Sequence, residues 1–501
     1  MDLFAHLATG FGVALTPDNF LYCLLGATLG TLVGVLPGIG PLTTIAMLLP
    51  LTFKMTPVAS LIMLSGIYYG AHHAGSTTAI MLNTPGDPSS LVICLDGHPM
   101  ARQGRAGPAL CIAAFGSFFA GSFGVLLMAL FSPPLAGVAL RFAAPEYACL
   151  VLVALIATVV LARGRFLLNV GMSVLGLLLG TVGTDIESGT MRFTFGSPNL
   201  ADGINFIIIA VGVFAFAEVI SNLGRDRIGR TPAAPLRSLW PRRSDLAAAW
   251  KPILRGTVLG SALGLLPGTG PMVSSVAAYS LERQLAKDRS RFGNGAIEGV
   301  AGPEAANNAA AITHFIPMLT LGIPAGAAMA LMLGAMLVQG IAPGPRMISE
   351  HPDVFWGLLA SMWLGNLMLL VLNLPLVGIW IRLLTIPYRI LVPAILVFCC
   401  IGVYSVNNSS FDVVLAAGFG VLGYAFSMLR CQPMPLIVGF ILGPVLEQSL
   451  RRALLLSRGD LATFVMRPIS LTLLIFAAGL ILYAALSWYR DGRRQALPGV
   501  R

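Results

Sequence analysis

Two clusters of polar residues lie within strongly apolar sequence, and each is followed by a break rich in Pro and Gly. The first cluster comprises His72, His73, Ser76, Thr77 and Thr78, and the second comprises Asn307, Asn308, Thr313 and His314. The breaks that follow are Leu82–Ser90, which contains Asp87, and Leu319–Gly326. Free backbone amides at the start of a half-helix favour anions, and Asn, Ser and Thr oxygens can hold sodium. This combination indicates cation-coupled uptake of a carboxylate.

A second pair of interruptions precedes these clusters. Val-Leu-Pro-Gly-Ile-Gly-Pro at Val35–Pro41 returns as Leu-Leu-Pro-Gly-Thr-Gly-Pro at Leu265–Pro271, 230 positions later. Proline lacks a backbone donor and glycine permits unusual dihedral angles, so each tract should break a helix. At membrane depth such a break survives only where protein or a water-filled cavity covers it, and paired breaks in two halves of a chain indicate a transporter's binding site.

We therefore predict that four broken segments converge on one polar cavity that holds the solute. The predicted solute-binding residues are Gly38, Gly40, Thr43, Thr44, Asn83, Thr84, Gly268, Gly270, Ser274, Ser275, Asn307, Asn308 and Thr320. Sodium contacts are expected near Asp87 and Asn307, although Asp87 could instead cap a half-helix. His72 and His73 are either polar residues that face other helices or direct contacts of the solute or a proton. Glu304 is a candidate because carboxylates within membranes are costly.

The composition predicts an all-α polytopic membrane protein with about 10–12 transmembrane helices. The 501 residues are 56% hydrophobic and only 10% charged, whereas soluble domains carry roughly 25% charged residues. The net charge of +10 does not indicate nucleic-acid binding, because eight of the basic residues lie in the one loop Arg225–Arg255. The seven cysteines have no metal-ligand spacing and are expected to pack in the interior. Met1–Thr16 has no basic segment typical of a removable signal peptide.

Four regions follow from the repeat. We expect a first membrane repeat over 1–224 with a re-entrant hairpin at 20–53, and a basic cytoplasmic linker over 225–255. A second repeat over 256–450 carries its hairpin at 256–281, and a C-terminal helix and tail span 451–501. The stretch between the basic loops at Arg225–Arg255 and Glu282–Arg291 is too short for two full crossings, so a hairpin fits better. Five crossings between the two hairpins would invert the second copy.

The positive-inside tendency assigns the membrane sides. The basic loop Asp96–Gly107 and the C-terminus are expected on the cytoplasmic side, and the acidic loop Asp185–Asp202 on the outer side. One conflict remains in this topology. Arg451, Arg452 and Arg458 would then lie outside, against the tendency.

No enzyme motif accompanies the apolar segments. The sequence lacks HExxH, GxSxG, Walker and His/Cys metal-binding patterns, so no cofactor is expected and energy must come from an ion gradient or a separate subunit. The alternatives are a channel or exporter of organic anions and, in a third class, an intramembrane enzyme that uses His72, His73 and Asp87.

The tracts together resemble the large membrane subunit of the tripartite tricarboxylate transporter family (TctA-type), over about Phe20 to Leu450. The matching segments are Gly34–Pro41, Tyr69–Ser90, Asp96–Ala109, Gly264–Pro271, Pro303–Ala311 and Thr320–Gly326. His72, His73 and His314 depart from the small residues expected there.

The resemblance implies a secondary transporter of the bacterial inner membrane that imports a tricarboxylate, a dicarboxylate or a related acid by sodium or proton symport. It also implies two partners, a small membrane subunit and a periplasmic solute-binding protein, and would suit an elevator-like motion. We further expect that the subunit can form a homodimer.

Overall fold

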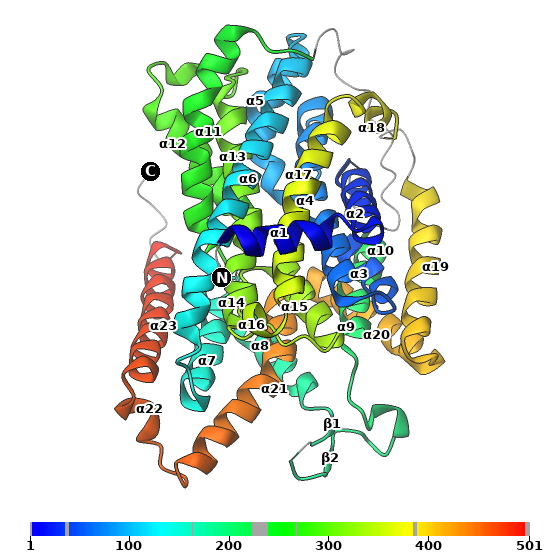
Figure 1. Ribbon diagram of the computed structural model, residues 1–501, viewed down its shortest axis with the longest axis vertical. Coiled ribbons are helices and arrows are strands. Elements are labelled where there is room, and N and C mark those ends of the chain that lie inside the picture. The colour runs from blue at the N-terminus through cyan, green and yellow to red at the C-terminus, as the bar shows by residue number, and fades with distance from the viewer. Residues whose placement is uncertain are drawn as a thin grey trace.

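The computed structural model describes residues 3–35, 40–162, 164–185, 187–222, 239–266, 268–383 and 388–495. Helices make up nearly all of this part of the chain (Figure 1). In the first half they are α1 (Leu3–Ala14), α2 (Pro17–Val35), α3 (Pro41–Thr52), α4 (Pro57–Leu82), η1 (Pro88–Val92), α5 (Ile93–Arg102), α6 (Ala106–Ala139), α7 (Ala144–Leu161), α8 (Phe166–Gly180), η2 (Pro198–Leu200), α9 (Phe206–Ala210), η3 (Val211–Phe216) and α10 (Ala217–Asn222).

The second half continues in the same style, with two further broken helices. Its elements are α11 (Arg243–Gly264), α12 (Gly270–Leu285), η4 (Arg289–Arg291), α13 (Glu298–Thr313), α14 (Phe315–Leu321), α15 (Ala327–Val338), α16 (Met347–Glu350), α17 (Pro352–Asn373), α18 (Val377–Leu383), α19 (Tyr388–Asn407), α20 (Ser410–Met428), α21 (Pro433–Leu456), α22 (Thr463–Met466) and α23 (Pro468–Gln495).

Seven helices of the described part are long and apolar enough to cross a bilayer, fewer than the 10–12 expected. Counted over the described residues alone, six further apolar stretches of helix have 10–17 residues. The 26-residue helix α4 is outside the apolar set, because His72, His73 and several Ser and Thr residues lower its hydropathy. The protein is therefore an all-helical, multi-pass membrane protein whose polar helix α4 is buried along most of its length.

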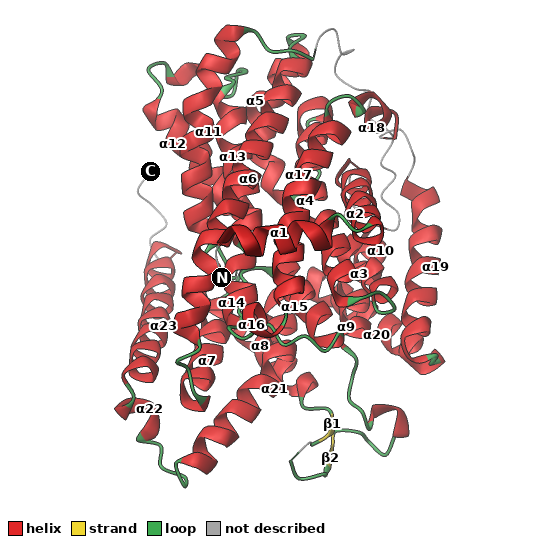
Figure 2. Cartoon of the chain, in the orientation of Figure 1, coloured by secondary structure: helices red, strands yellow, loops and turns green. Residues whose placement is uncertain are grey.

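A two-stranded hairpin is the small exception to the all-α prediction (Figure 2). Strand β1 (Gly183–Thr184) pairs antiparallel with β2 (Met191–Arg192), with Gly183 opposite Arg192. Gly189 takes a φ of +68° in the connecting turn, a conformation that residues with a side chain rarely adopt. This hairpin lies at the end of the molecule opposite α5, α11 and α12.

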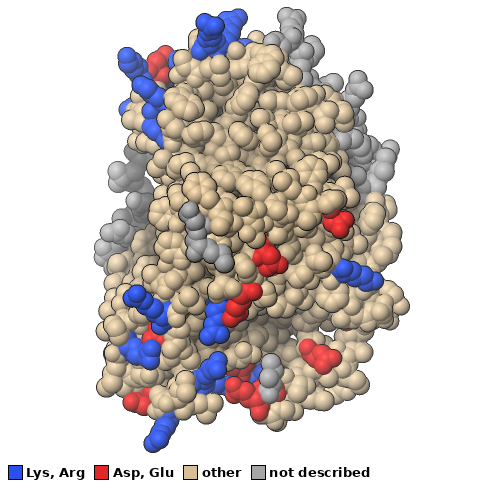
Figure 3. Space-filling view, viewed as in Figure 1, with Lys and Arg blue, Asp and Glu red and all other residues tan. Residues whose placement is uncertain are grey.

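On one face of the molecule, charged residues cluster at the upper end and are spread over the lower half (Figure 3). On the face drawn in Figure 3, a broad band without Lys, Arg, Asp or Glu separates the upper charged cluster from the charges over the lower part. This distribution is expected when the middle of a protein faces lipid, where charges are costly.

Glycine ridges hold together the helices that precede and follow each Pro-Gly tract. A β-carbon placed on Gly26, Gly30 or Gly34 of α2 would lie 2.4–2.5 Å from a carbonyl oxygen of α4. On α11, a β-carbon placed on Gly256 or Gly260 would lie 2.2 Å from a carbonyl oxygen of α13. These glycines therefore allow the close approach of neighbouring helices. The pairs α2–α4 and α11–α13 use matching glycines, which supports two related repeats.

Ion pairs and hydrogen bonds join loops that the sequence placed on the same side. At one end, Arg105 pairs with Asp245 at 2.7 Å, and the side chain of Gln103 donates to the Asn294 carbonyl at 2.9 Å. At the other end, Arg451 pairs with Asp185 at 3.0 Å and with Glu447 at 2.7 Å. The positive charge of Arg451, which conflicted with the predicted topology, is thus compensated by the acidic loop.

Two expected loops are partly helical. The linker expected over 225–255 is wrong in its second part, because α11 begins at Arg243. Asp96–Gly107 was predicted to be a loop, yet its first part belongs to α5. The turn comes only at Gln103–Arg105, where Gly104 takes a φ of +77°. Asp96 lies within this short helix and accepts a hydrogen bond from the Gly295 amide, which joins α5 to the loop after α12.

Candidate functional site

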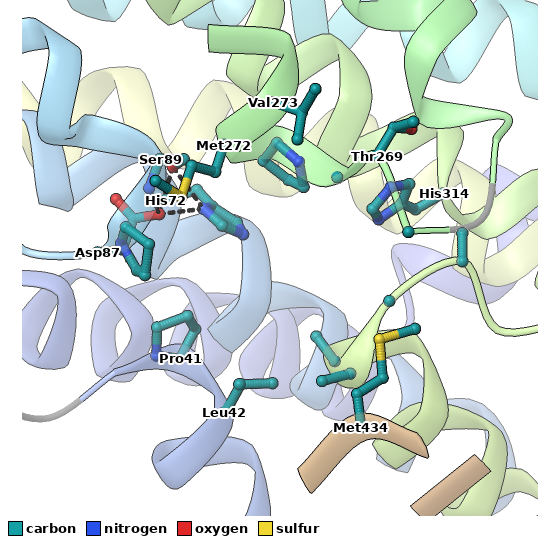
Figure 4. A pocket seen from close by; sticks show the side chains of 18 of the residues that line it. Pro41, Leu42, His72, Asp87, Ser89, Thr269, Met272, Val273, His314 and Met434 are labelled. Atoms are coloured by element: carbon teal, nitrogen blue, oxygen red, sulfur yellow. Dashed lines mark hydrogen bonds and ion pairs between the residues drawn. The ribbon is translucent and has the colours of Figure 1, made fainter. Parts of the chain in front are cut away.

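The four interruptions of the chain line a single cavity of about 290 Å³ (Figure 4). Pro41 and Leu42 come from the first Pro-Gly tract, and Gly268–Val273 from the second. The later breaks contribute Asp87–Ser89 and Ala325–Ala328. The convergence predicted from the sequence is therefore observed. The lining is more apolar than expected, and its polar side chains are Tyr68, His72, Asp87, Ser89, Thr269, His314 and Gln432.

The two later breaks have the same backbone design. Asn83 caps the C-terminus of α4 and Gly322 caps that of α14, both in the left-handed conformation with φ of 54° and 71°. Four residues further on, Asp87 and Gly326 are extended and begin the next helical segments, η1 and α15. An Asn or Gly at the left-handed position followed by Pro is a strong signal for the end of a helix.

The second Pro-Gly tract is tied to the later break of its own half. The amide of Gly268 donates to the Ala325 carbonyl at 2.9 Å. Gly268 has a φ of +80°, and a β-carbon there would lie 2.3 Å from the side chain of Leu161. Glycine is therefore required at this position both for its backbone conformation and for its close contact with α7.

Asp87 is the centre of a buried hydrogen-bond cluster on one wall of the cavity. Its Oδ2 lies 2.9 Å from Nδ1 of His72 and accepts from the Ser89 amide at 3.2 Å. Its Oδ1 accepts from the Ser90 amide at 3.3 Å, and the Ser89 hydroxyl also donates to the carboxylate. The carboxylate thus caps η1 and pairs with His72, which favours the capping role of the two roles considered for Asp87.

His314 occupies the opposite wall, at the junction of α13 and α14. It is 2% exposed, and within the described part of the chain its Nε2 atom has no hydrogen-bond partner. His72 is 6% exposed, its Nε2 atom likewise has none in that part, and Tyr68 packs edge-on against its ring at 4.6 Å. Figure 4 places His72 with Asp87 and Ser89 on one side, and His314 with Thr269 on the other.

The two halves place their polar groups differently at matching positions. In the first half, a β-carbon on Gly75 would lie 2.5 Å from Oδ1 of Asp87. In the second, a β-carbon on Gly326 would lie 3.5 Å from Cε1 of His314. Counted from the left-handed caps, Gly75 matches His314 and Asp87 matches Gly326. In the first half the carboxylate of Asp87 packs against Gly75, whereas in the second half the imidazole of His314 packs against Gly326.

A second polar cluster surrounds Glu304 and joins the two halves. Its Oε1 accepts from the Ser117 hydroxyl at 2.8 Å and from the Asn308 amide group at 3.1 Å, and its Oε2 accepts from Ser76 at 2.5 Å. Glu304 is 1% exposed. The cost of burying a carboxylate is offset here by three donors, from α4, α6 and α13.

The other predicted site residues fall into distinct places. Gly268 and Gly270 line the cavity, whereas Gly40 precedes α3 outside the lining and Gly38 lies outside the described residues. The hydroxyls of Thr44, Ser274 and Thr320 donate to backbone carbonyls of their own helical segments. Thr84 donates to Leu82, Asn83 caps α4, and Thr43 is buried.

Three predicted site residues differ in whether their side chains form hydrogen bonds: Asn307, Asn308 and Ser275. Asn308 belongs to the Glu304 cluster. Both polar atoms of Asn307 and the hydroxyl of Ser275 are buried without a hydrogen-bond partner in the part of the chain that the structure describes. Nor does that part contain a group of three or more His, Cys, Asp or Glu side chains that could hold a metal ion.

Sequence reasoning missed several residues of the lining. Ser89 and Thr269 lie within two positions of predicted residues, and Tyr68 lies about one helical turn before His72, so proximity in the sequence was a usable signal. Gln432 and Met434 flank the start of α21, and nothing in their local sequence indicates that they reach a cavity between distant helices.

Comparison with known proteins gives one family and two close relatives. Residues 20–438 match the tripartite tricarboxylate transporter TctA family. An uncharacterized 52.8 kDa protein of Agrobacterium vitis, from the TAR-I ttuC' 3' region, is 55% identical over 493 residues, which are 98% of each chain. A second uncharacterized protein of that organism, from the TAR-II ttuC' 3' region, is 55% identical over 236 residues, which cover 47% of this chain and 98% of the relative. No solved structure matches.

Proposed function

Because the chain belongs to the tripartite tricarboxylate transporter TctA family, we propose that it imports a carboxylate by cation-coupled symport and binds the solute in the cavity between its four interruptions. The family is one of transporters, so the chain is a transporter subunit and not an enzyme. The solute class comprises tricarboxylates, dicarboxylates and related organic acids.

The observation that carries this proposal is the meeting of both Pro-Gly tracts and both later breaks on one cavity. Broken helices end in backbone groups without partners in their own helix, and these groups can bind an ion or a polar solute. The predicted backbone contacts Gly268 and Gly270 lie on the cavity. Asn307 precedes the lining residue His314 by seven positions, and its Nδ2 and Oδ1 atoms have no hydrogen-bond partner within the described residues.

The transport motion would follow from an inverted repeat. We assign α2–α3 and α11–α12 to two re-entrant hairpins of opposite orientation, one in each half. The matching glycine ridges of α2 and α11 and the matching caps at Asn83 and Gly322 support the repeat. A core made of the hairpins and the later breaks would move as an elevator against the remaining helices.

Partners and location follow from the tripartite family. We place the chain in the bacterial inner membrane with its C-terminus in the cytoplasm, beside a small membrane subunit and fed by a periplasmic solute-binding protein. It can also form a homodimer. The coupling ion is sodium or a proton, and sodium contacts would lie near Asp87 and Asn307.

The test is uptake of labelled citrate into membrane vesicles that contain the chain and its small subunit, with the solute-binding protein added. We expect uptake to require both an ion gradient and the binding protein. Passive flux without either would instead support an organic-anion channel, and gradient-driven efflux would support an exporter.

A cavity-filling variant links uptake to this site. Ala327→Phe places a ring at a lining position and should abolish uptake, whereas Val414→Phe changes a residue that is 70% exposed on α20 and should leave uptake unchanged. Normal uptake by correctly inserted Ala327→Phe would remove the cavity from the transport path.

A further inference from the structure

The cavity presents an electrostatic problem for an anionic solute. Among its lining residues, all of which the structure describes, none is Lys or Arg, and Asp87 contributes a carboxylate. Arg163, which follows the lining residues Leu161 and Ala162 in sequence, lies outside the described part. Burying an anion without a compensating cation is strongly unfavourable. The positive charge must therefore arrive with the solute or form in the cavity.

Two imidazoles are the groups in this lining that can gain positive charge near neutral pH. His72 and His314 come from opposite halves and face the cavity from opposite walls (Figure 4). Both are more than nine-tenths buried, and the Nε2 atoms of both have no partner within the described residues. An imidazole is the side chain whose ordinary titration falls closest to physiological pH.

The hydrogen bond of His72 prepares its ring for protonation. Asp87 Oδ2 lies 2.9 Å from Nδ1, so the neutral ring carries its hydrogen on Nδ1 and presents a lone pair at Nε2. A proton taken up at Nε2 would then be available for donation to a carboxylate oxygen in the cavity. Asp87 stabilises the resulting imidazolium, as a carboxylate beside a histidine commonly does.

The surroundings of the two rings differ. His72 faces Asp87, Ser89 and Tyr68, and His73 is its neighbour in the sequence. The near neighbours of the His314 ring include Gly270 and Gly326. A proton on His72 therefore forms an ion pair with Asp87, whereas His314 has no hydrogen bond to a carboxylate within the described residues, so a proton on it adds a positive charge that a solute carboxylate could balance.

We propose, building on the carboxylate transport proposed above, that His72 and His314 form a two-imidazole site that binds a solute with at least two carboxylates and takes up protons together with it. One carboxylate faces each Nε2 atom. The coupling ions of this chain are then protons, which bind from the side that the solute enters and leave with it.

The test measures proton uptake during binding of citrate, succinate or malate to the purified transporter complex. Calorimetry in two buffers of different ionisation enthalpy gives the number of protons taken up per solute bound. We expect proton uptake by the unaltered protein in sodium-free buffer, and affinity that weakens as the pH rises from 6 to 8. Each coupled proton weakens binding up to tenfold per pH unit.

Three variants separate the role of His314 from a structural one. His314→Gln should lower proton uptake by about one per solute, and His314→Gly, which copies the matching Gly75, should do the same. His351→Gln, which changes a histidine between α16 and α17 outside the cavity, should not. His72→Gln would leave the buried Asp87 without its imidazole partner, so it is a less direct probe.

Several results would overturn the proposal. Equal proton uptake by the unaltered protein and both His314 variants would do so, as would binding that requires sodium and ignores pH. Loss of binding in Arg163→Gln with normal binding in His314→Gln would assign the charge to Arg163 instead. Carboxylate binding without proton uptake refutes this inference alone, whereas absence of binding to all three acids, together with absence of vesicle uptake, refutes the proposed function as well.

Discussion

Replacing Asp96 should loosen the junction between the two halves of the protein. Asp96 lies on α5 and is fully buried. Its Oδ1 accepts from the backbone amides of Gly293, Gly295 and Ala296 at 2.8–2.9 Å, and its Oδ2 accepts from the Tyr279 hydroxyl at 2.9 Å. One carboxylate of the first half thus organises the whole loop between α12 and α13 of the second.

The magnitude follows from counting donors. A net contribution of roughly 1 kcal/mol for each of the four hydrogen bonds gives a loss of about 4 kcal/mol in Asp96→Ala. Asp96→Asn keeps an oxygen for the three amides and turns its NH₂ group toward Tyr279, whose hydroxyl can accept. The loss then comes from the missing charge, and about 1–2 kcal/mol is expected.

The assay is denaturation in detergent micelles, compared among variants under one condition. Asp288→Ala is the matched control, because Asp288 lies in the same loop and its side chain accepts from Ser290 at an exposed site. We expect the order of stability to be Asp288→Ala, Asp96→Asn, then Asp96→Ala, from most to least stable. The reasoning would be refuted if Asp96→Ala lay within about 1 kcal/mol of the unaltered protein.

Three more perturbations have defined outcomes. Gly260→Ala should destabilise the protein by about 1–3 kcal/mol, because its β-carbon would meet a carbonyl oxygen of α13 at 2.2 Å. Gly418→Ala, with open space around it, should stabilise the protein by about 0.5–1 kcal/mol. Equal denaturation midpoints of the two variants would contradict the role of Gly260 in close helix packing. Asn307→Ala should abolish citrate uptake, because its amide group is free to bind the solute. Membrane insertion should stay normal, because the side chain has no hydrogen bond to lose within the described residues. Normal uptake by this variant would remove Asn307 from the site. The Glu187 amide and Arg451 lower the pKa of Asp185 to about 2, so this carboxylate stabilises the β1–β2 hairpin above about pH 4 and the effect is lost as the pH falls toward 2. Proteolysis with an acid-active protease should detect that opening, and Asp185→Asn should make cleavage independent of pH over the same range.

Local signals predicted much of the fold and part of the site. Proline and glycine determine where helices break, so the tracts at Val35–Pro41 and Leu265–Pro271 and the later breaks could be located from the sequence. The spacing of Gly26, Gly30 and Gly34 is itself a signal of helix packing, because a four-residue repeat of small residues lies on one face of a helix.

Contacts between residues far apart in the chain could not be predicted from local sequence patterns. The hydrogen bonds of Asp96 connect residues about 200 positions apart. The local sequence around Asp96 does not distinguish an aspartate in an exposed loop from one that is buried and accepts hydrogen bonds from a distant loop. Thr44, Ser274 and Thr320 were predicted to contact solute, but a hydroxyl in an apolar helix can also donate to its own backbone, and the sequence does not distinguish the two uses. The Gln432 and Met434 contributions depend on where α21 crosses the core.

Solute protection of introduced cysteines tests most directly whether the two halves form one binding cavity. In a variant without the seven native cysteines, Leu42→Cys and Thr269→Cys place a thiol on the cavity from each half, and Phe195→Cys places one on an exposed loop. A water-soluble thiol reagent should label all three, and citrate should protect Leu42→Cys and Thr269→Cys but not Phe195→Cys. If citrate protected neither cavity position, or if both remained unlabelled under every condition while Phe195→Cys reacted, the four interruptions would not form a solute site.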